Sequence, residues 1–291
     1  MNDSGFIEKR FSAPDGLGLS ARVYSDGLEG PLPAVCLPGL TRNARDFHDL
    51  ALHLARDAAQ PRKVVVFDYR GRGRSASDPD WRNYNLKVEA GDVAAGLAAL
   101  GIGRAAFIGT SRGGLIVFLL AALRPALIAA AVLNDIGPVV EGAGLARIRA
   151  RLSRAPKPAS FDEAVGILKA SEVAAFPALT DADWLRTVRA THRDENGRPV
   201  PDFDPNLLKT LKAIDFSKPL PVLWPQFLGL CAVPVLAIRG ENSTLLSAHT
   251  LAEMAKRHPR LETVTVPGQG HAPLLETGDL PSRIERFLAQ G

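Results

Sequence analysis

Short runs of consecutive hydrophobic residues alternate along the chain with stretches in which hydrophobic residues recur every three or four positions. The runs are typical of strands buried on both faces of a parallel sheet, and the stretches are typical of helices with one buried face. Two extended segments near the N-terminus also predict an opening hairpin. The strands are expected at residues 5–12, 19–24, 33–38, 63–69, 105–110, 127–134, 233–240 and 261–268.

Helical stretches separate these strands, so the order of elements repeats a strand–helix unit. Such a repeat predicts an α/β fold, built on a mainly parallel, doubly wound sheet of eight strands. The helices are expected at residues 44–58, 85–101, 112–125, 246–259 and 281–290.

The repeat fails once, between residues 138 and 228, where strand patterns give way to proline-rich helical stretches. We interpret residues 138–228 as a helical cap, without strands, inserted after the sixth strand of the sheet. The α/β core is then expected to comprise residues 1–137 and 229–291.

One hydrophobic stretch, residues 113–133, has the length of a membrane-spanning helix, but Arg124 and Pro125 interrupt it. A spanning helix needs about 20 uninterrupted hydrophobic residues. We therefore predict a buried helix followed by a buried strand.

Composition and charge narrow the class of protein. The chain has 291 residues, of which 46% are hydrophobic and 23% are charged, the balance of a folded globular protein. A formal net charge of +4, without long runs of like charge, argues against a nucleic-acid or membrane partner. The sequence MNDSGFIEKR lacks the hydrophobic region of a secretory signal, so a cytoplasmic location is expected. Cys36 and Cys231 lie in or beside hydrophobic runs, which favours buried free thiols over a disulfide.

The candidate chemistry begins at FIGTSRGG, residues 107–114. Gly109, Ser111 and Gly113 form the pattern G-x-S-x-G, with a predicted strand before it and a predicted helix after it. The glycines admit a tight turn, and the helix N-terminus favours negative charge that develops beside the serine. Ser111 is therefore the candidate nucleophile, on a turn known as a nucleophile elbow.

A serine hydroxyl needs a base, and six histidines are available. Five of them lie on predicted helices or in the segment 138–228, where surface or packing roles explain them. His271 instead lies in VPGQGHAPLLE, a glycine-rich loop directly after the last predicted strand. This loop would bring an imidazole to the carboxyl edge of the sheet, so His271 is the candidate base.

Together these features resemble the α/β-hydrolase superfamily, in its capped branch with a serine nucleophile. The resemblance rests on GTSRGG, CLPGLTRNARDF, DYRGRGRS, the helical insert and GQGHAPLL, and it covers nearly the whole chain. It implies a hydrolase that uses a serine, a histidine and a carboxylate. Branches that cleave epoxides or haloalkanes have an aspartate at the elbow, so Ser111 argues against those activities.

The resemblance also implies an oxyanion hole of two backbone N–H groups. Carried over to this sequence, the donors are those of Arg112, next to the nucleophile, and Leu40, in the loop after the third strand. This loop reads LPGL and departs from the His-Gly common in the family, because Pro38 precedes Gly39. The change removes a side chain but leaves the Leu40 N–H in place. We interpret the Arg112 side chain as structural rather than as a ligand for a substrate carboxylate.

The carboxylate of the triad has several candidates. The family commonly takes it from the loop after the strand at 233–240, where the aligned position holds Thr244, which carries no charge. Asp135 ends the preceding strand of the sheet, as does the acid in small bacterial esterases that this region resembles. Glu241 lies three positions before Thr244 and reads more simply as a solvated turn residue. A receptor with no acid at all is the third alternative. We favour Asp135. A receptor without an acid is disfavoured, because a degenerate site need not keep the nucleophile, the base and both oxyanion positions.

The sequence therefore predicts a serine hydrolase of carboxylic esters or related acyl compounds. Ser111, Asp135 and His271 are the expected catalytic residues, acting on a small ester-like molecule through an acyl-enzyme intermediate and without a cofactor. The alternatives are a lactonase or C–C bond hydrolase with the same triad, and a non-hydrolysing receptor for a small molecule.

Two features of residues 138–228 are left open by the sequence. Arg147, Arg151 and Arg154 share one helical face, which is typical of a solvated surface and less often of a site for an acidic substrate. Four large hydrophobic residues form either the core of the cap or the lining of a pocket: Trp184, Leu223, Trp224 and Phe227.

Overall fold

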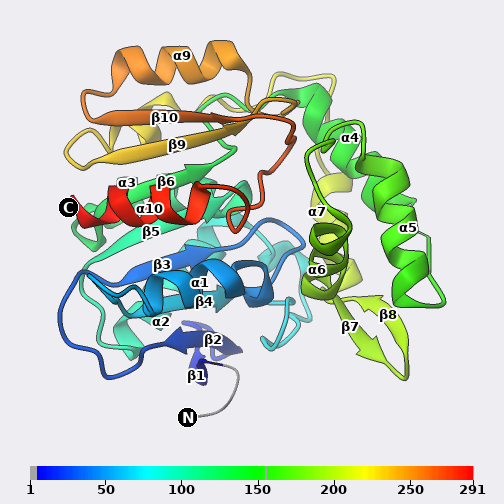
Figure 1. Ribbon diagram of the computed structural model, residues 1–291, viewed down its shortest axis with the longest axis horizontal. Coiled ribbons are helices and arrows are strands. Elements are labelled where there is room, and N and C mark those ends of the chain that lie inside the picture. The colour runs from blue at the N-terminus through cyan, green and yellow to red at the C-terminus, as the bar shows by residue number, and fades with distance from the viewer. Residues whose placement is uncertain (1–4, 155, 291) are drawn as a thin grey trace.

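A computed structural model gives the structure of residues 5–154 and 156–290. The eight strands of its central sheet are β1 (Ile7–Ser12), β2 (Gly18–Tyr24), β3 (Ala34–Leu37), β4 (Val64–Asp68), β5 (Ala105–Thr110), β6 (Ile128–Asn134), β9 (Val235–Gly240) and β10 (Leu261–Val266). They lie in the order β1-β2-β4-β3-β5-β6-β9-β10 (Figure 1). β2 pairs antiparallel with β1 and β4, and the other neighbouring strands are parallel. The predicted eight-stranded, mainly parallel α/β sheet is confirmed.

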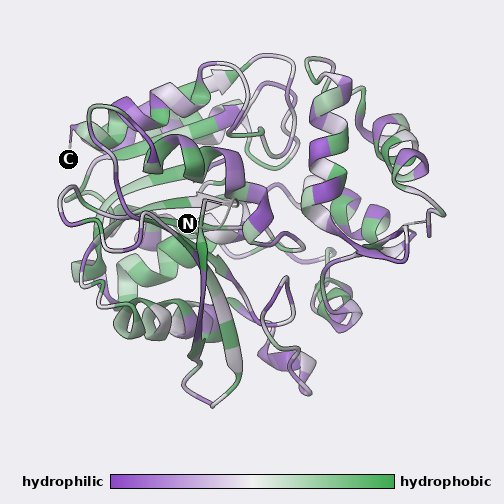
Figure 2. Cartoon of the chain, turned by 60° about the horizontal axis from the view of Figure 1, so that its bottom comes forward, coloured by the Kyte–Doolittle hydropathy of each residue, from purple (hydrophilic) through white to green (hydrophobic). Residues whose placement is uncertain are grey.

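Helices cover both faces of this sheet. α1 (His48–Ala55) and α10 (Leu280–Ala289) pack on one face, and α2 (Leu86–Ala99), α3 (Arg112–Leu123) and α9 (Ala248–Arg257) contribute to the hydrophobic cluster on the other. Every residue of β3, β4, β5 and β6 is buried as a result. Figure 2 shows that hydrophobic residues predominate in the sheet. Burial on both faces is the reason for the unbroken hydrophobic runs in the sequence.

The long hydrophobic stretch is divided where the sequence predicts. α3 ends at Leu123, a short 3₁₀ helix η3 (Pro125–Leu127) follows, and β6 begins at Ile128. Pro125 starts η3, because a proline ring is compatible with the first turn of a helix but not with its interior. No helix in the described part of the chain is long and hydrophobic enough to cross a membrane.

A separate group of elements lies between β6 and β9, beside the sheet (Figure 1). It consists of α4 (Gly142–Ser153), α5 (Phe161–Glu172), α6 (Asp181–Thr191), β7 (His192–Glu195), β8 (Arg198–Pro201), η4 (Pro205–Leu207), α7 (Leu208–Lys212) and α8 (Trp224–Leu228).

The expectation that this segment has no strands is wrong, because β7 and β8 form an antiparallel hairpin. Asn196 and Gly197 connect the two strands, with φ angles of 55° and 83°. An Asn-Gly pair with positive φ is the preferred turn of a tight hairpin. The sequence pattern did not predict these strands, because β7 reads HRDE and has no hydrophobic alternation.

Contacts in its middle and at its C-terminal end join this segment to the sheet and its helices. Arg45, in the 3₁₀ helix η1 (Ala44–Phe47), donates from Nε to the Ala190 carbonyl at 3.2 Å and forms an ion pair with Asp202 at 2.7 Å. At the C-terminal end of the segment, the ring of Phe227 in α8 packs edge-on against Phe118 of α3, with centroids 6.0 Å apart. The segment is therefore held to the rest of the molecule in its middle and at its C-terminal end.

Candidate active site

The turn between β5 and α3 presents Ser111 at the carboxyl edge of the sheet. Ser111 has a φ of 51°, a conformation that L-residues rarely adopt. A Cβ atom on Gly109 would come within 2.6 Å of the Gly113 carbonyl carbon, and one on Gly113 would collide with the Leu37 carbonyl group. Both glycines of the pattern are thus required by close backbone packing around the turn.

The three residues predicted as catalytic lie in one hydrogen-bonded line. His271 Nε2 is 2.9 Å from Ser111 Oγ, and His271 Nδ1 is 2.7 Å from Asp135 Oδ2. They come from three segments, namely the turn after β5, the end of β6 and the loop after β10. Parallel strands end at the same edge of the sheet, which brings these distant residues together.

Asp135 is fully buried and accepts two further hydrogen bonds. The Gly240 N–H donates to Oδ1 at 2.9 Å, and the Ser243 hydroxyl donates to Oδ2 at 2.6 Å. Both donors lie in RGENSTLLS, the region where the family commonly has its acid. This loop thus supplies hydrogen bonds to the carboxylate instead of the carboxylate itself.

Glu241 and Thr244, the two positions on the loop after β9, are not bonded to His271 in the structure. Glu241 is exposed and accepts a hydrogen bond from the Gly268 N–H at 2.8 Å. Thr244 is also exposed, with its backbone packed closely against Gly144 of α4. The carboxylate within hydrogen-bond distance of His271 Nδ1 is that of Asp135.

The two amides predicted as oxyanion donors are held by their backbone surroundings. The Gly39 carbonyl accepts from the Arg42 N–H at 3.2 Å, which fixes the peptide that carries the Leu40 N–H on its opposite side. Arg112 is the first residue of α3, so its N–H has no acceptor within the helix. Its side chain is turned away, because Nε donates to Glu89 at 2.6 Å. This position agrees with the structural role predicted for that side chain.

A pocket of about 80 Å³ adjoins Ser111 and His271. One part of its wall comes from α4, which contributes Ile148, Arg151 and Leu152. The remaining lining comes from the loops at the edge of the sheet and includes Leu40, Arg42, Asp46, Phe47, Leu274, Leu275 and Glu276.

Most of this lining was not predicted from the sequence. Arg151 was expected on a face typical of a solvated surface, and Ile148 was not singled out, although the hydrophobic positions of α4 indicate that one face of that helix is covered. The large hydrophobic residues named as core or pocket candidates are used in packing. Trp184 packs edge-on against Phe176, Phe227 packs against α3, and Leu223 and Trp224 pack against the core cluster on that side.

Glu276 is a titratable residue of the pocket lining whose carboxyl group is largely buried. Burial and the nearby Asp46 raise the pKa of Glu276 to about 7, although Arg186 of α6 acts in the opposite direction. Its Oε1 atom lies 3.2 Å from Arg186 Nε. Among the described residues, no three His, Cys, Asp or Glu side chains are grouped as a metal site requires.

A family model described as the alpha/beta hydrolase fold matches residues 33–277. The chain belongs to the alpha/beta hydrolase fold family. A crystal structure of an alpha/beta hydrolase from Novosphingobium aromaticivorans is 39% identical in sequence and superimposes with a TM-score of 0.91, covering 99% of each chain.

Two curated relatives of this alpha/beta hydrolase carry names of known activities. The 3-hydroxybutyrate-oligomer hydrolase of Cupriavidus necator is 34% identical over an alignment of 284 residues that covers 92% of each chain. The 2-(acetamidomethylene)succinate hydrolase of Mesorhizobium japonicum is 28% identical over 243 residues, covering 83% of this chain and 82% of that protein. The alpha/beta hydrolase described here is an enzyme of the hydrolase class.

Proposed function

We propose that this alpha/beta hydrolase cleaves carboxylic esters through an acyl-enzyme intermediate, with Ser111, His271 and Asp135 as its catalytic triad. The observation that carries the proposal is the unbroken line from Ser111 Oγ through both ring nitrogens of His271 to Asp135 Oδ2, with distances of 2.9 and 2.7 Å. Nucleophile, base and orienting acid in hydrogen-bond contact are the arrangement that activates a serine hydroxyl.

In the proposed reaction each group has one role. Ser111 Oγ attacks the ester carbonyl while His271 Nε2 takes its proton, and the Leu40 and Arg112 N–H groups donate to the resulting oxyanion. Asp135 accepts the Nδ1–H bond and stabilises the imidazolium that forms. His271 returns the proton to the leaving alcohol, and then activates a water molecule that releases the acid from Ser111.

For the substrate, we propose a short ester of a hydroxy acid. The 34% identity to a 3-hydroxybutyrate-oligomer hydrolase across 92% of both chains supports this class. The lining is compatible with this class, since Ile148 and Leu152 offer hydrophobic contacts for short carbon chains. Arg151, whose Nη1 pairs with Glu172 at 2.6 Å, has further N–H groups for a terminal carboxylate.

We also propose that residues 138–228 act as a cap that sets specificity. The proposal rests on α4, which borders the pocket beside Ser111 without contributing to the hydrogen-bonded line. Elements placed over a fixed catalytic edge tend to carry selectivity rather than chemistry.

Labelling and a substrate panel test the proposed function. A fluorophosphonate probe should label the wild-type enzyme and leave Ser111→Ala unlabelled, because labelling requires an activated serine. The panel comprises the dimer of 3-hydroxybutyrate, its methyl ester, p-nitrophenyl butyrate, a γ-lactone and 2-(acetamidomethylene)succinate. Hydrolysis of the dimer with the highest kcat/KM is expected. Absence of labelling would contradict the serine mechanism, and preference for the lactone or the succinate would contradict the substrate class.

A further inference from the structure

One buried carboxylate, that of Glu89, lies between two arginines that belong to opposite sides of the candidate oxyanion hole. Glu89 is on α2 and has no exposed surface. Its Oε1 accepts from Arg72 Nη1 at 2.8 Å, and its Oε2 accepts from Arg112 Nε at 2.6 Å. The sequence predicted an oxyanion role for the Arg112 N–H and a structural role for its side chain, and it gave no role to Arg72 or Glu89.

Both arginines are connected to the segments that carry the proposed oxyanion donors. Arg72 Nε donates to the Leu40 carbonyl at 2.9 Å, so its guanidinium holds the loop that carries the Leu40 N–H. Arg112 carries the second N–H on its own backbone, and its Nη2 donates to the Tyr84 carbonyl at 3.1 Å. A single carboxylate therefore connects two chain segments that must present their N–H groups to the same oxygen.

The cluster is charged and almost completely removed from water. Burial opposes ionisation of Glu89, but the two guanidinium groups outweigh it and lower the pKa of that carboxyl. Ionised Glu89 and two arginines leave a net positive charge next to the oxyanion hole. Within the described residues, Arg72 Nη2 has no hydrogen-bond acceptor, so this guanidinium is not fully satisfied by its neighbours. Both features favour a negative charge developing nearby.

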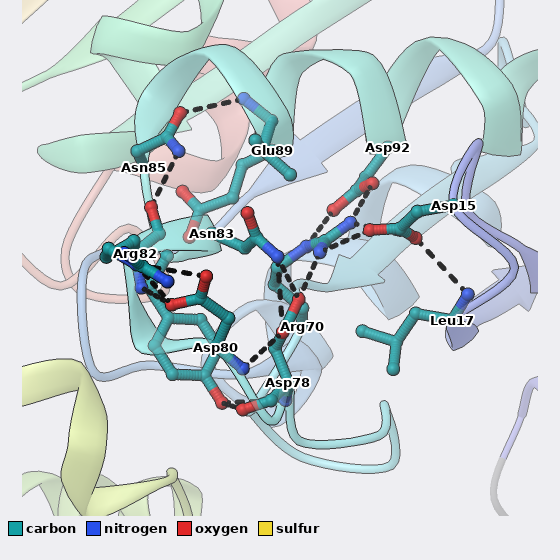
Figure 3. Close-up of polar contacts among 12 residues, drawn as sticks. Asp15, Leu17, Arg70, Asp78, Asp80, Arg82, Asn83, Asn85, Glu89 and Asp92 are labelled. Atoms are coloured by element: carbon teal, nitrogen blue, oxygen red, sulfur yellow. Dashed lines mark hydrogen bonds and ion pairs between the residues drawn. The ribbon is translucent and has the colours of Figure 1, made fainter.

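The neighbouring Arg70 shows a contrasting arrangement (Figure 3). It is bonded to three carboxylates: Asp15 at 2.9 Å, Asp78 at 2.5 Å and Asp92 at 2.7 Å. Asp92 lies three residues after Glu89, on the same side of α2, and is also buried. The Arg70 backbone carbonyl accepts from Arg72 Nη1 at 2.7 Å, but the Arg70 side chain bonds to Asp15, Asp78 and Asp92 instead of to the groups that hold Leu40 and Arg112. Asp92 therefore provides a structural control for Glu89.

We propose that Glu89 is a positioning residue that holds the two oxyanion donors at a fixed separation, through Arg72 to the Leu40 loop and through Arg112 to the start of α3. The inference rests on the proposed serine mechanism and extends it to groups that do not touch the substrate. Misplacement of a catalytic group by about 1 Å costs on the order of a hundredfold in rate, which sets the upper size of the expected effect.

The test compares Glu89→Gln with Asp92→Asn. Glutamine places an NH₂ group opposite one of the arginines, so one of the two connections is lost. We expect kcat for a p-nitrophenyl ester to fall by about tenfold to a hundredfold, with KM changed by less than about twofold. Affinity for a boronic acid, which forms a tetrahedral adduct with the serine, should fall by a similar factor. Asp92→Asn should lower Tm to a comparable extent and leave kcat and boronic acid affinity within about twofold of wild type.

Equal losses of Tm in both variants, with kcat and boronic acid affinity unchanged in Glu89→Gln, would overturn the inference and leave Glu89 a structural residue. If Glu89→Gln does not fold, Arg112→Gln tests the same link, because its side chain is 13% exposed and its backbone N–H is retained. It should show the same fall in kcat and boronic acid affinity, and wild-type values would reject the proposal. Failure of the serine mechanism itself is recognised separately, by turnover that survives Ser111→Ala.

Discussion

A serine hydroxyl becomes a nucleophile only when a base takes its proton, and Ser111 Oγ lies 2.9 Å from His271 Nε2. Because the two groups act as one unit, Ser111→Ala and His271→Ala should each lower kcat by about 10⁴-fold or more. The double variant should be little worse than either single one. Steady-state kinetics on a p-nitrophenyl ester measure this, with Tm as the control for folding. Turnover of Ser111→Ala within tenfold of wild type would reject Ser111 as the nucleophile.

Single substitutions also distinguish Asp135 from Glu241 as the acid of the triad. Asp135→Asn keeps the side-chain volume but favours the wrong tautomer of His271, so kcat should fall by roughly 10³- to 10⁴-fold. Glu241→Gln is the matched control, since Glu241 is exposed and bonded to Gly268, and should stay within about twofold of wild type. The kcat of both purified variants provides the comparison. The reverse result, a crippled Glu241→Gln and an active Asp135→Asn, would move the acid to the loop.

Residue types and their neighbours in sequence were enough to predict Ser111 and His271, because the elbow pattern and the glycine-rich loop are local. Asp135 was preferred over Glu241 because it ends the sixth strand, as the acid does in the small bacterial esterases that this region resembles, and because Glu241 read as a solvated turn residue. Ser243, which donates to Asp135 at 2.6 Å, lies 108 positions away in the chain. No local sequence pattern predicts this hydrogen bond, because the bond depends on how the ends of two strands are placed relative to each other.

Among the elements, α4 borders the pocket and is expected to control which acyl chains fit. Ile148→Ala enlarges the pocket beside Ser111, so kcat/KM for longer acyl esters should rise relative to short ones by about tenfold. The profile is measured on p-nitrophenyl esters from acetate to octanoate.

Trp224→Ala is the control for Ile148→Ala. Trp224 packs edge-on against Phe227, with ring centroids 5.8 Å apart, and lies beside the guanidinium of Arg257. Its loss should lower Tm while the order of substrates is kept. A changed substrate profile in Trp224→Ala, or an unchanged one in Ile148→Ala, would show that α4 is not the element that sets specificity.

In the hairpin of β7 and β8 and in the helix α2, the sequence pattern predicts some structural features and not others. The strand HRDE is polar and has no hydrophobic period, so the Asn-Gly turn that follows it is the sequence feature that indicates a hairpin. In α2, Glu89 and Asp92 share a buried face with Ala90, Val93, Gly96 and Leu97. Buried carboxylates in such a face need partners, but the sequence does not say that the partners are Arg72 and Arg112 for one and Arg70 for the other.

At the scale of the whole molecule, Glu276 connects the stability of the fold to pH. It lies in the loop after β10 and faces Arg186 of α6, so it belongs to the contact between residues 138–228 and the sheet. Burial and Asp46 raise its pKa from 4.5 to about 7. The folded state thus keeps a proton that the unfolded chain releases, and stability from this group is present below about pH 4.5 and is lost as pH rises towards 7.

Glu276→Gln should remove that loss, because an amide does not ionise. The free energy of unfolding of wild type, relative to Glu276→Gln, should decline between pH 5 and pH 8 by up to about 3 kcal/mol. Urea unfolding at several pH values measures both proteins under the same conditions. Parallel curves across this range would mean that the Glu276 carboxyl titrates in the folded state as it does in water.

The sequence by itself determined the eight strands, the helices between them and the residues around the elbow. Hydrophobic period, glycine at close backbone approaches and the arginine-proline break after α3 act over a few neighbouring residues, so their effects can be predicted without knowing the rest of the fold. Only the tertiary structure decided which carboxylate faces His271, that α4 and not Trp224 borders the pocket, and that Glu89 joins Arg72 to Arg112. These are contacts between distant segments, 136 positions apart for His271 and Asp135, and they are decided by the packing of strands and helices against one another.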